Sequence, residues 1–232
     1  MELRLLRQLN ALRSARRAAI LITDLAGGPN QLIAEGDVVD GALGEAVTSA
    51  FRSGKSVAKE IDRRSLFLNV HLPPMHIVVI GAVHISQVLA QMAVLTGFDI
   101  RVIDPRTAFA TPERFEGIDL VADWPVDALK ERPLDAYTAL VAVTHDPAID
   151  DIPIIDALKT GCFYVGALGS RKTHANRLER LRRAGVAEAD LARIHAPIGL
   201  PIGAANPAEI AIAILAEIVG ALRSRALSAS KN

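Results

Sequence analysis

One loop of this 232-residue sequence combines glycine with basic residues in a pattern that suits an anion. The segment from Gly166 to Lys172 reads Gly-Ala-Leu-Gly-Ser-Arg-Lys and precedes a basic stretch predicted to be helical. Gly166 and Gly169 free the backbone to turn its N–H groups toward a ligand. Ser170, Arg171 and Lys172 then open a helix at its positive end. This arrangement is typical of a phosphate-binding loop.

The helix predicted to follow this loop is rich in basic residues. It carries, in order, His174, Arg177, Arg180, Arg182 and Arg183. We expect these side chains to extend the attraction for an anion along the helix. The commonest alternative is a solvated basic face, which suits the last two arginines but not Ser170 or Arg171.

A second loop, from Gly81 to Ser86, follows an apolar run and opens another predicted helix. Its position matches the dinucleotide fingerprint, in which glycines let the backbone approach a pyrophosphate. Only Gly81 fits, because Val83 and Ser86 occupy the other two glycine positions. Gly81, Ala82 and His84 are candidate ligand-binding residues, and an ordinary strand-to-helix turn is an equal alternative.

An acidic residue follows the next apolar run. Asp104 comes 23 residues after Gly81, close to the spacing at which an acidic residue holds a ribose hydroxyl in nucleotide-binding folds. An aspartate directly before proline also commonly caps a turn, and Pro105 follows here. The two interpretations have comparable weight.

A third strand end supplies three polar side chains. Thr144, His145 and Asp146 place a hydroxyl, an imidazole and a carboxylate after another apolar run. His145 is able to exchange protons near neutral pH. Asp146 precedes Pro147, and we favour a purely structural role for it as a helix N-cap.

The loop from His195 to Gly203 is apolar and too rich in proline and glycine for a helix or a strand. Such a loop is rarely left open to water. One interpretation makes it a cover of the ligand crevice, with His195 facing the ligand. The other makes it a packed connector, with His195 hydrogen-bonded in the interior.

These loops end segments that alternate between strand and helix from Met75 onward, the pattern of βαβ units in a parallel sheet. The predicted strands are 76–80, 99–103, 139–143 and 163–165. A helix over 85–96 has Gly97 as its C′ residue, and the next helix starts at Pro147 and ends at Gly161. Because loops at the carboxyl ends of such strands share one crevice, we expect the candidate residues to lie together.

A smaller unit precedes Met75. Its predicted elements are an arginine-rich helix within residues 1–17, a strand over 18–25, a turn over 27–30, a helix over about 44–52 and two short strands. We place the domain boundary at Pro73 and Pro74. The fold is therefore α/β, with a small α/β N-terminal domain (residues 1–73) and a Rossmann-like parallel-sheet domain (residues 74–232).

The last helix has the clearest start signal in the sequence. Asn206, Pro207 and Glu209 match an N-cap residue, the N1 position and the N3 position. We expect this helix to end near Arg223, followed by a frayed polar tail over 224–232.

Composition narrows the function classes. Lysine plus arginine (26) equals aspartate plus glutamate (26), which removes the strong positive field of a dedicated nucleic-acid-binding protein. No apolar run reaches about 18 residues, and the N-terminus lacks a signal-peptide core, so we expect a cytoplasmic protein that does not enter a membrane. Cys162 is the only cysteine, and we expect it to be buried rather than reactive.

Four segments resemble the XdhC/CoxI family, and the resemblance is dense from Ile77 to Ala221. They are Phe109-Ala-Thr-Pro-Glu-Arg-Phe115, Tyr164-Val-Gly-Ala-Leu-Gly-Ser-Arg-Lys172, His195-Ala-Pro-Ile-Gly-Leu200 and Asn206-Pro-Ala-Glu-Ile-Ala211. Members of that family are accessory proteins of molybdenum hydroxylases such as xanthine dehydrogenase and carbon monoxide dehydrogenase. The resemblance implies a chaperone rather than a catalyst. Such a chaperone binds the molybdenum cofactor (molybdopterin), protects it while a cysteine desulfurase helps to install a terminal sulfur, and assists its insertion into the apoenzyme.

Two positions depart from the family pattern. Val83 stands where the family usually has glycine, which narrows the room for a backbone approach. Ala42 lies where members often carry a cysteine in a Gly-Gly-Cys motif, and alanine offers no thiolate to molybdenum or sulfur.

Three functions follow as hypotheses. The first is the molybdenum cofactor chaperone, with the cofactor phosphate at Ser170 and Arg171. The second is an NAD(P)-dependent oxidoreductase that uses the same crevice, with His145 or His195 as the acid. The third is an interaction module that has lost ligand binding. The apolar loop after His195 and the last helix also suggest a homodimer.

Overall fold

A computed structural model describes residues 2–227, which divide into two compact units. The first unit runs up to Pro74 and includes the end of the last helix from Arg223. The second unit runs from Met75 to Leu222.

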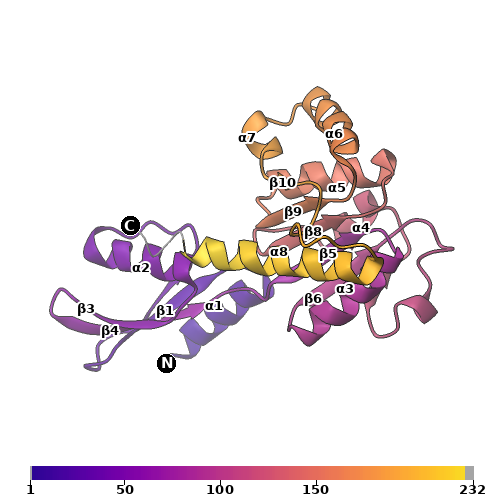
Figure 1. Cartoon of the computed structure of the whole chain (residues 1–232). Helices are drawn as coiled ribbons and strands as arrows, with labels where there is room; N and C mark the ends of the chain where they lie inside the picture. Colours follow the sequence, from indigo (N-terminus) through magenta and orange to yellow (C-terminus); the bar gives the residue numbers. More distant parts are fainter. Residues whose placement is uncertain (1, 228–232) are drawn as a thin grey trace. The chain divides into compact units, whose positions relative to one another are not determined.

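The first unit is a four-stranded antiparallel sheet with two helices (Figure 1). Its elements are α1 (Leu3–Ser14), β1 (Ala19–Asp24), β2 (Gln31–Ala34), α2 (Gly41–Ser53), β3 (Val57–Ile61) and β4 (Arg64–His71). The strand order is β2-β1-β4-β3. Ile20 of β1, Leu68 of β4 and Val47 of α2 are buried in one cluster that holds α2 on the sheet. The helix starts at Gly41, three residues earlier than the pattern of apolar residues predicts.

The second unit is built on a six-stranded sheet in which every pairing is parallel. Its strands are β5 (His76–Ile80), β6 (Asp99–Ile103), β7 (Asp119–Val121), β8 (Thr138–Ala142), β9 (Tyr164–Ala167) and β10 (Ile194–His195). Its helices are α3 (His84–Leu95), η1 (Pro112–Arg114), α4 (Pro125–Glu131), α5 (Pro147–Lys159), α6 (Arg171–Arg183), α7 (Glu188–Leu191) and α8 (Pro207–Leu227). The order β10-β9-β8-β5-β6-β7 is the doubly wound Rossmann order. The predicted fold class is confirmed.

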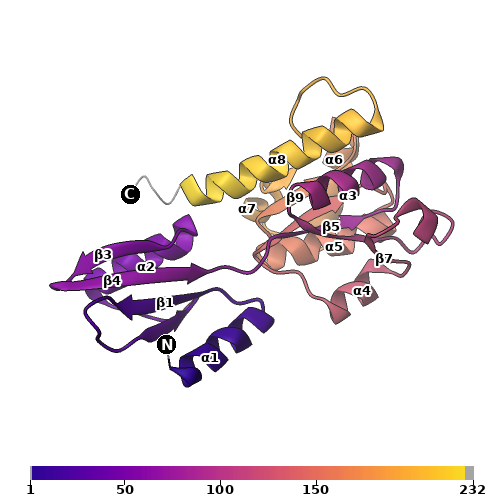
Figure 2. The ribbon, with the colours of Figure 1, turned by 90° about the horizontal axis from the view of Figure 1, so that it is seen from below.

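Helices cover both faces of this sheet (Figures 1 and 2). On one face, Leu89 of α3 and Ile214 of α8 pack with strand residues such as Val141. On the other face, Ile154 of α5 and Leu181 of α6 pack in a second cluster. Because the central strands are buried on both sides, their sequences are continuous apolar runs rather than alternating ones.

The predicted elements of this unit differ from the structure mainly at their ends. β5 and β6 have the predicted bounds, whereas β8 starts one residue earlier and β9 covers 164–167 instead of 163–165. Gly97 (φ 80°) and Gly161 (φ 75°) follow helix ends as predicted.

The last helix also starts where the sequence predicts. The Glu209 N–H donates to Asn206 Oδ1 at 3.0 Å, and α8 begins at Pro207. The prediction that it ends near Arg223 is wrong, because the helix continues to Leu227 through residues that favour helix. The rest of the predicted frayed tail, 228–232, lies outside the described residues. Between residues 2 and 227, no helix is both long and apolar enough to cross a membrane.

Candidate functional site

The strand order reverses between β5 and β8, so the loops after these strands meet at the switch point where doubly wound folds bind ligands. Gly81 follows β5 with φ 118°, and Thr144 lies in the loop after β8. A Cβ atom at Gly81 would lie 2.8 Å from Thr144 Cγ2. The glycine is therefore required for the close packing of the two loops, whether or not a ligand binds there.

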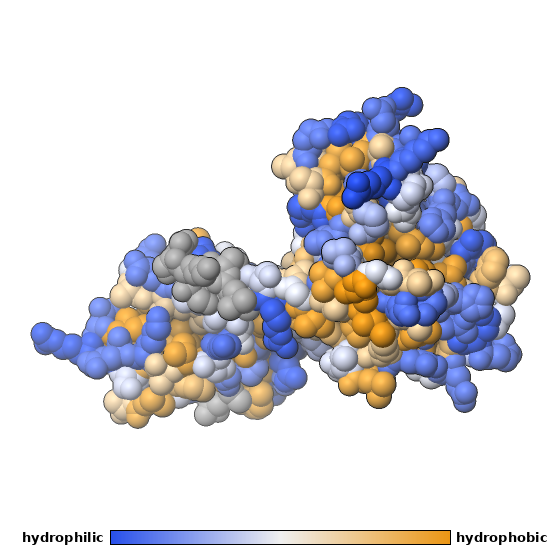
Figure 3. Space-filling model, viewed as in Figure 1, coloured by the Kyte–Doolittle hydropathy of each residue, from blue (hydrophilic) through white to orange (hydrophobic). Residues whose placement is uncertain are grey.

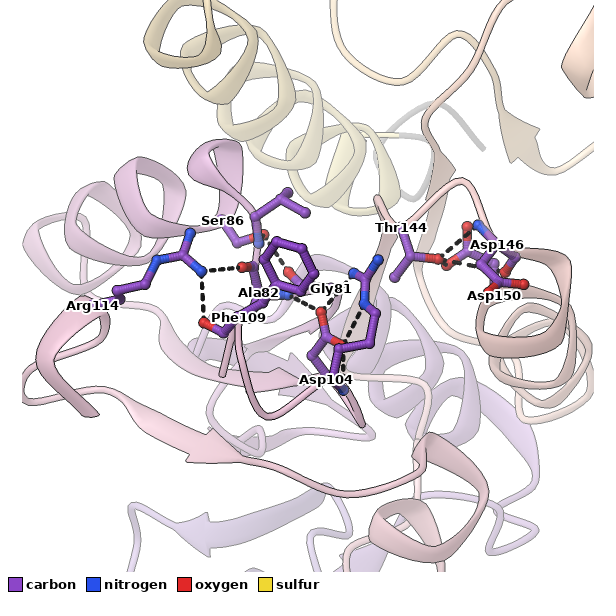
Figure 4. A network of polar contacts seen from close by, with 11 residues as sticks. Gly81, Ala82, Ser86, Asp104, Phe109, Arg114, Thr144, Asp146 and Asp150 are labelled. Carbon is purple, nitrogen blue, oxygen red and sulfur yellow. Dashed lines mark hydrogen bonds and ion pairs between the residues drawn. The ribbon is translucent and has the colours of Figure 1, made fainter. Parts of the chain in front are cut away.

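Asp104 fixes the first loop to the end of β6 (Figure 4). Its fully buried carboxylate accepts the N–H of Ala82 at 2.7 Å and the N–H of Arg106 at 2.9 Å. The Arg106 guanidinium adds two bonds, from Nε at 2.9 Å and from Nη2 at 2.7 Å. Burial alone would raise the pKa of Asp104, but these hydrogen bonds outweigh burial and lower it. The Asp104 carboxylate therefore caps the turn, which is one of the two roles predicted for it. To contact a ribose, this carboxylate would first have to lose its hydrogen bonds to Arg106.

Arg106 is a site residue that the sequence analysis missed. Its guanidinium lies over the Phe109 ring, 4.7 Å from the centroid, and its side chain is 32% exposed. Asp146 and Asp150 contribute to raising its pKa, after the larger effect of Asp104. The sequence contained a signal for this contact, because Asp104-Pro105-Arg106 places a cation two residues after a carboxylate that caps a turn.

Arg114 fastens the first loop from the other side (Figure 4). Its Nη1 donates to the carbonyl oxygens of Ala82 at 3.1 Å and Phe109 at 2.7 Å. Its Nη2 donates to Gln87 Oε1 at 3.0 Å, and Gln87 Nε2 donates back to the Arg114 carbonyl at 3.1 Å. One role of the 109–115 segment is therefore to hold the turn after β5 in place.

Ser86 and Val83 of this loop also have roles within the protein, whereas His84 faces solvent. The Ser86 hydroxyl donates to the Gly81 carbonyl oxygen. Val83 has φ −100°, which any residue can adopt, and its half-buried side chain packs against the core. His84 is exposed in the first turn of α3.

The loop after β8 shows the predicted N-cap. Asp146 Oδ1 accepts the N–H of Ala148 at 2.9 Å, which confirms the structural role favoured for this residue. Thr144 Oγ1 accepts the N–H of Asp146 at 3.0 Å and donates to Asp150 Oδ1 at 2.7 Å. His145 is exposed and has φ 65°, in the left-handed region that favours glycine.

Two buried charged residues lie beneath these loops. Asp150 and Arg177 are 1% and 2% exposed. Arg177 Nη2 donates to the carbonyl oxygen of Leu168 at 3.0 Å, whereas its Nε and Nη1 and Asp150 Oδ2 have no hydrogen-bond partner within the described chain. Burial raises the pKa of Asp150 to about 6, although the Thr144 hydroxyl and Arg177 oppose this. Arg177 thus places a buried positive charge under the loop before α6, and Asp150 and Asp151 are the acidic groups that interact with it.

The first N–H groups at the start of α6 are not used by the described part of the protein itself. Ser170 is the N-cap, and its Oγ accepts the Thr173 N–H at 3.2 Å. Within residues 2–227, no acceptor faces the N–H groups of Gly169, Ser170, Arg171 and Lys172. At α3 the Ala82 N–H is taken by Asp104, and at α5 the Asp146 carboxylate occupies the helix start.

The basic residues farther along α6 do not strengthen this site as expected. Arg180 forms an ion pair with Asp151 at 2.6 Å, and Arg182 and Arg183 pair with Glu188 and Glu179. The expectation that the whole helix attracts an anion is therefore corrected. Acidic side chains neutralise its second half: Glu179 lies one helical turn before Arg183, whereas Asp151 and Glu188 come from outside the helix and are not revealed by its periodicity.

Gly166 and His195 lie side by side on β9 and β10. A Cβ atom at Gly166 would lie 2.6 Å from both Ile198 Cδ1 and the Tyr164 hydroxyl. Only glycine leaves room at position 166 for these two side chains. This packing explains the glycine without any contact to a ligand.

His195 contacts a carboxylate that the sequence analysis missed. Its Nδ1 lies 3.0 Å from Glu217 Oε1, and Glu217 Oε2 accepts the Tyr164 hydroxyl at 2.6 Å and the Gly199 N–H at 2.8 Å. The only signal for Glu217 was its charge within the otherwise apolar stretch from Ile210 to Leu222.

The loop after His195 combines features of both interpretations. Ile198 is buried at 7% exposure, as in a packed connector, whereas Leu200 and Ile202 are 42% and 54% exposed. Ile212 of α8 is also exposed, at 50%, and Figure 3 shows apolar surface over the region where Figure 1 places α8.

The structure also shows where the single thiol and the candidate metal ligands lie. Cys162 is 1% exposed, and burial raises the pKa of its thiol to about 12, which confirms the expected structural role. Ala42 is exposed in the first turn of α2. Across the described part of the chain, no group of three or more His, Cys, Asp or Glu side chains is placed to hold a metal ion.

Comparisons with known proteins agree on one family. Residues 77–218 match the XdhC Rossmann domain. YqeB of Escherichia coli (strain K12) is 37% identical over 161 residues, which cover 67% of this chain and 29% of that protein. A relative in Bacillus subtilis (strain 168), a probable subunit of xanthine dehydrogenase, is 32% identical over 156 residues, covering 67% of this chain and 45% of the relative.

Two further matches concern function and fold. The molybdenum cofactor insertion chaperone PaoD of Escherichia coli (strain K12) is 27% identical over 147 residues, covering 63% of this chain and 40% of PaoD. The chain thus spans less than half the length of these curated relatives. The crystal structure of a xanthine dehydrogenase from Bacillus halodurans has the same fold, with a TM-score of 0.69 at 22% identity, covering 98% of this chain and 69% of that one.

Proposed function

The chain belongs to the XdhC family, and from this we propose that it is an accessory protein of a molybdenum enzyme that binds the molybdenum cofactor by its phosphate at the start of α6. The names of two relatives, a molybdenum cofactor insertion chaperone and a probable subunit of xanthine dehydrogenase, support the accessory role. The apoenzyme of a molybdenum hydroxylase is the proposed partner, and the homodimer stays a prediction.

The free N–H groups at the start of α6 carry the proposal. A helix start attracts anions because its first N–H groups lack acceptors and its dipole is positive there. The Asp146 carboxylate occupies the start of α5, and Asp104 takes the Ala82 N–H just before α3. The first turn of α3 holds no lysine or arginine, whereas α6 combines N–H groups that are unpaired within the described residues with Arg171 and Lys172. Ser170 caps this helix through its hydroxyl, and the backbone N–H groups remain for the ligand.

Three positive side chains fit an anion at this position. Arg171 and Lys172 are exposed in the first turn, and no acidic side chain pairs with either one in the described chain. Arg177 lies buried behind the loop with two nitrogen atoms unpartnered. A phosphate ester would meet N–H donors, mobile cations and a fixed positive charge, which is the donor set that phosphate prefers.

The bound group would supply a pterin ring system and a molybdenum centre, and this chain would supply recognition and shelter. The residues predicted at the same edge of the sheet, Thr144, His145 and His195, are the proposed contacts for the rest of the cofactor. His145 is exposed with a backbone conformation that residues other than glycine rarely adopt, a feature often found at functional sites.

The chain does not provide a thiol for a sulfur relay. Cys162 is its only cysteine and is buried, and Ala42 occupies the position of the family cysteine. If the cofactor receives its terminal sulfur while bound here, we propose that a partner such as a cysteine desulfurase delivers the sulfur directly.

The geometry favours this function over nucleotide-dependent redox chemistry. A dinucleotide bound in the Rossmann manner would use the first-loop amides and the carboxylate after the second strand. Here the Ala82 N–H and the Asp104 carboxylate bond to each other. The anion-binding elements at α6 also argue against a module that has lost its ligand.

A charge substitution at the N-cap tests the anion site. Aspartate and asparagine are both good N-caps, so Ser170→Asp and Ser170→Asn should both keep α6 folded. Ser170→Asp places a negative charge among the free N–H groups. We expect it to weaken binding of purified molybdenum cofactor by tenfold or more, while Ser170→Asn binds within about threefold of the wild type. Equal affinity of the two variants would contradict the proposal.

A second pair of variants tests the cations. Arg171→Ala with Lys172→Ala should reduce cofactor affinity by tenfold or more, because charge-assisted hydrogen bonds contribute about 1.5–3 kcal/mol each. Arg182→Ala with Arg183→Ala removes the same charge farther along the helix and should leave affinity unchanged. Titration with inorganic phosphate, followed by amide NMR, should shift the signals of Ser170, Arg171 and Lys172 first.

A further inference from the structure

A carboxylate, an imidazole and a phenol form a closed polar group between β9, β10 and α8. Tyr164 and His195 stack with their ring centroids 4.7 Å apart. Glu217 reaches both, since its Oε2 accepts the Tyr164 hydroxyl and its Oε1 lies 3.0 Å from His195 Nδ1. The Gly199 N–H adds a bond to Oε2 at 2.8 Å. Both the ring and the carboxylate of this group are thus fixed in orientation.

The bonds made by Glu217 determine which nitrogen of His195 carries the proton. Oε2 accepts two hydrogen bonds, from a phenol and from a backbone amide, and this set fits an ionised carboxylate. An ionised carboxylate has no proton to donate. The contact between Oε1 and Nδ1 therefore requires Nδ1–H as the donor, and in the neutral ring the lone pair is then on Nε2.

Tyr164 is fixed in its role as a donor. Burial and its bond to Glu217 raise the pKa of its hydroxyl above the usual range, so it stays protonated. It does not compete with His195 for a proton, and it keeps Oε2 occupied. The charged and titratable groups that contact His195 are Glu217 on α8 and Tyr164 on β9.

The imidazole of His195 is more exposed than the carboxylate that holds it. The His195 side chain is 39% exposed, whereas that of Glu217 is 17% exposed, and Nε2 has no partner within residues 2–227. His195 pairs in register with Gly166 at the carboxyl end of β9. The loop that leads to α6 starts from that strand end, so His195 and the anion site belong to the same edge of the sheet.

We infer that His195 is a proton-accepting residue of the site, held in the Nδ1–H tautomer by Glu217, and that its Nε2 takes the proton of a weakly acidic N–H, O–H or S–H group of the bound ligand. In that step the bond between the ligand atom and hydrogen breaks, and its electron pair stays on the ligand. An Nε2–H bond forms, and the imidazolium is stabilised by the Glu217 carboxylate. Glu217 is the positioning residue. The inference rests on the proposed function for the identity of the ligand, but not for the state of His195.

The tautomer can be measured without any ligand. In nitrogen-15 NMR spectra at alkaline pH, wild-type His195 should show a protonated Nδ1 and an unprotonated Nε2. Glu217→Gln replaces the obligate acceptor with an amide that can also donate, so the variant should show a mixture of tautomers. A wild-type His195 with the proton on Nε2 would overturn the inference, since no lone pair would then face the ligand.

Ligand contact is tested by chemical modification. Diethyl pyrocarbonate reacts with an imidazole nitrogen that has a lone pair, and mass spectrometry can follow the modification of His195 separately from that of the other histidines. Saturating molybdenum cofactor should slow the modification of His195 at least fivefold. Cofactor that binds without slowing this reaction would overturn the inference and leave the proposed function standing.

A matched variant separates the two nitrogens. His195→Asn keeps an N–H donor toward Glu217 and removes Nε2, so it should lower cofactor affinity about fivefold to tenfold and lose only the stability that the ring contact with Tyr164 contributes. Unchanged affinity would overturn the role of Nε2. If wild-type protein binds no cofactor at all, the proposed function and the ligand contact fail together, while the tautomer result still decides whether His195 presents a basic nitrogen.

Discussion

The carboxylate of Asp104 and the backbone N–H of Ala82 are 2.7 Å apart, and this hydrogen bond joins the carboxyl ends of β6 and β5. In a nucleotide-binding Rossmann domain, groups at these two places face the ligand. Here they satisfy each other, and Arg106 completes the shell of the carboxylate. The polar groups at the switch point thereby bond to one another, and this is why the anion site is proposed at the start of α6 instead.

Loss of the Asp104 carboxylate should therefore reduce stability. Asp104→Ala leaves the buried Ala82 N–H without an acceptor and Arg106 without its partner, and we expect a loss of about 2–3 kcal/mol in unfolding free energy at pH 7. The pKa of Asp104 is lowered in the folded state, so its contribution is present above about pH 4, the ordinary aspartate value, and is lost as pH falls through the folded-state value. Urea unfolding at several pH values measures this.

The exposed ion pair of Asp127 and Lys130 provides the control. Asp127→Ala should cost about 0.5 kcal/mol or less, because an exposed pair is screened by water. An Asp104 variant as stable as the Asp127 variant would show that the bond across the strand ends is dispensable.

This relationship also shows what sequence reasoning can reach. The spacing from Gly81 to Asp104 correctly predicts that both residues end adjacent parallel strands, because each strand is rich in β-branched apolar residues and is closed by turn residues. It does not reveal that Asp104 would bond Ala82. That contact depends on the lateral distance between two strands, which no local pattern encodes. The same holds for Glu217, whose partner His195 is 22 residues away.

Asp150 should give the stability of the protein an unusual pH dependence. Its pKa is raised by burial to about 6 in the folded state, so between about pH 4 and pH 6 the folded chain binds more protons at this site than the unfolded chain does. Its ionisation should reduce the unfolding free energy as pH rises through this window, by up to about 3 kcal/mol, and the effect should level off above it.

Asp150→Asn removes this titration and keeps an oxygen that accepts from Thr144. The difference in stability between variant and wild type should therefore shift in favour of the variant as pH rises from 4 to 7. Glu116→Gln, at an exposed position, should track the wild type throughout. Parallel curves for Asp150→Asn and the wild type would mean that Asp150 titrates as an ordinary surface carboxyl.

The glycines show a second limit of sequence reasoning. A glycine-rich loop after a strand predicts backbone that faces a ligand, and Gly169 has φ 138°, a conformation that favours glycine. Gly166 and Gly81 serve instead to admit Ile198, Tyr164 and Thr144. Backbone that faces a ligand and close packing by neighbouring side chains both require glycine, so the sequence cannot distinguish the two. The distance from a Cβ atom built at the glycine to its neighbours can.

Gly166→Ala should therefore destabilise the second unit. The added methyl group would lie 2.6 Å from Ile198 and from the Tyr164 hydroxyl, and such overpacking costs about 1–3 kcal/mol. Gly220→Ala in α8 is the matched control, since nothing lies within 4 Å of its added methyl group. It should gain about 1 kcal/mol from helix propensity. Thermal unfolding of the two variants should shift in opposite directions, and a neutral Gly166 variant would contradict the packing argument.

Cys162 should be inert in the folded protein. It is buried, and the pKa of its thiol is raised to about 12 by that burial, so the thiolate that reacts with sulfur or with alkylating reagents is scarce at pH 8. We expect iodoacetamide to label native protein at least a hundredfold more slowly than protein unfolded in urea. Cys162→Ala should leave transfer of sulfur from a cysteine desulfurase to the bound cofactor unchanged. Rapid native labelling, or loss of transfer in the alanine variant, would instead make Cys162 a sulfur carrier and remove the argument that a partner must deliver sulfur directly.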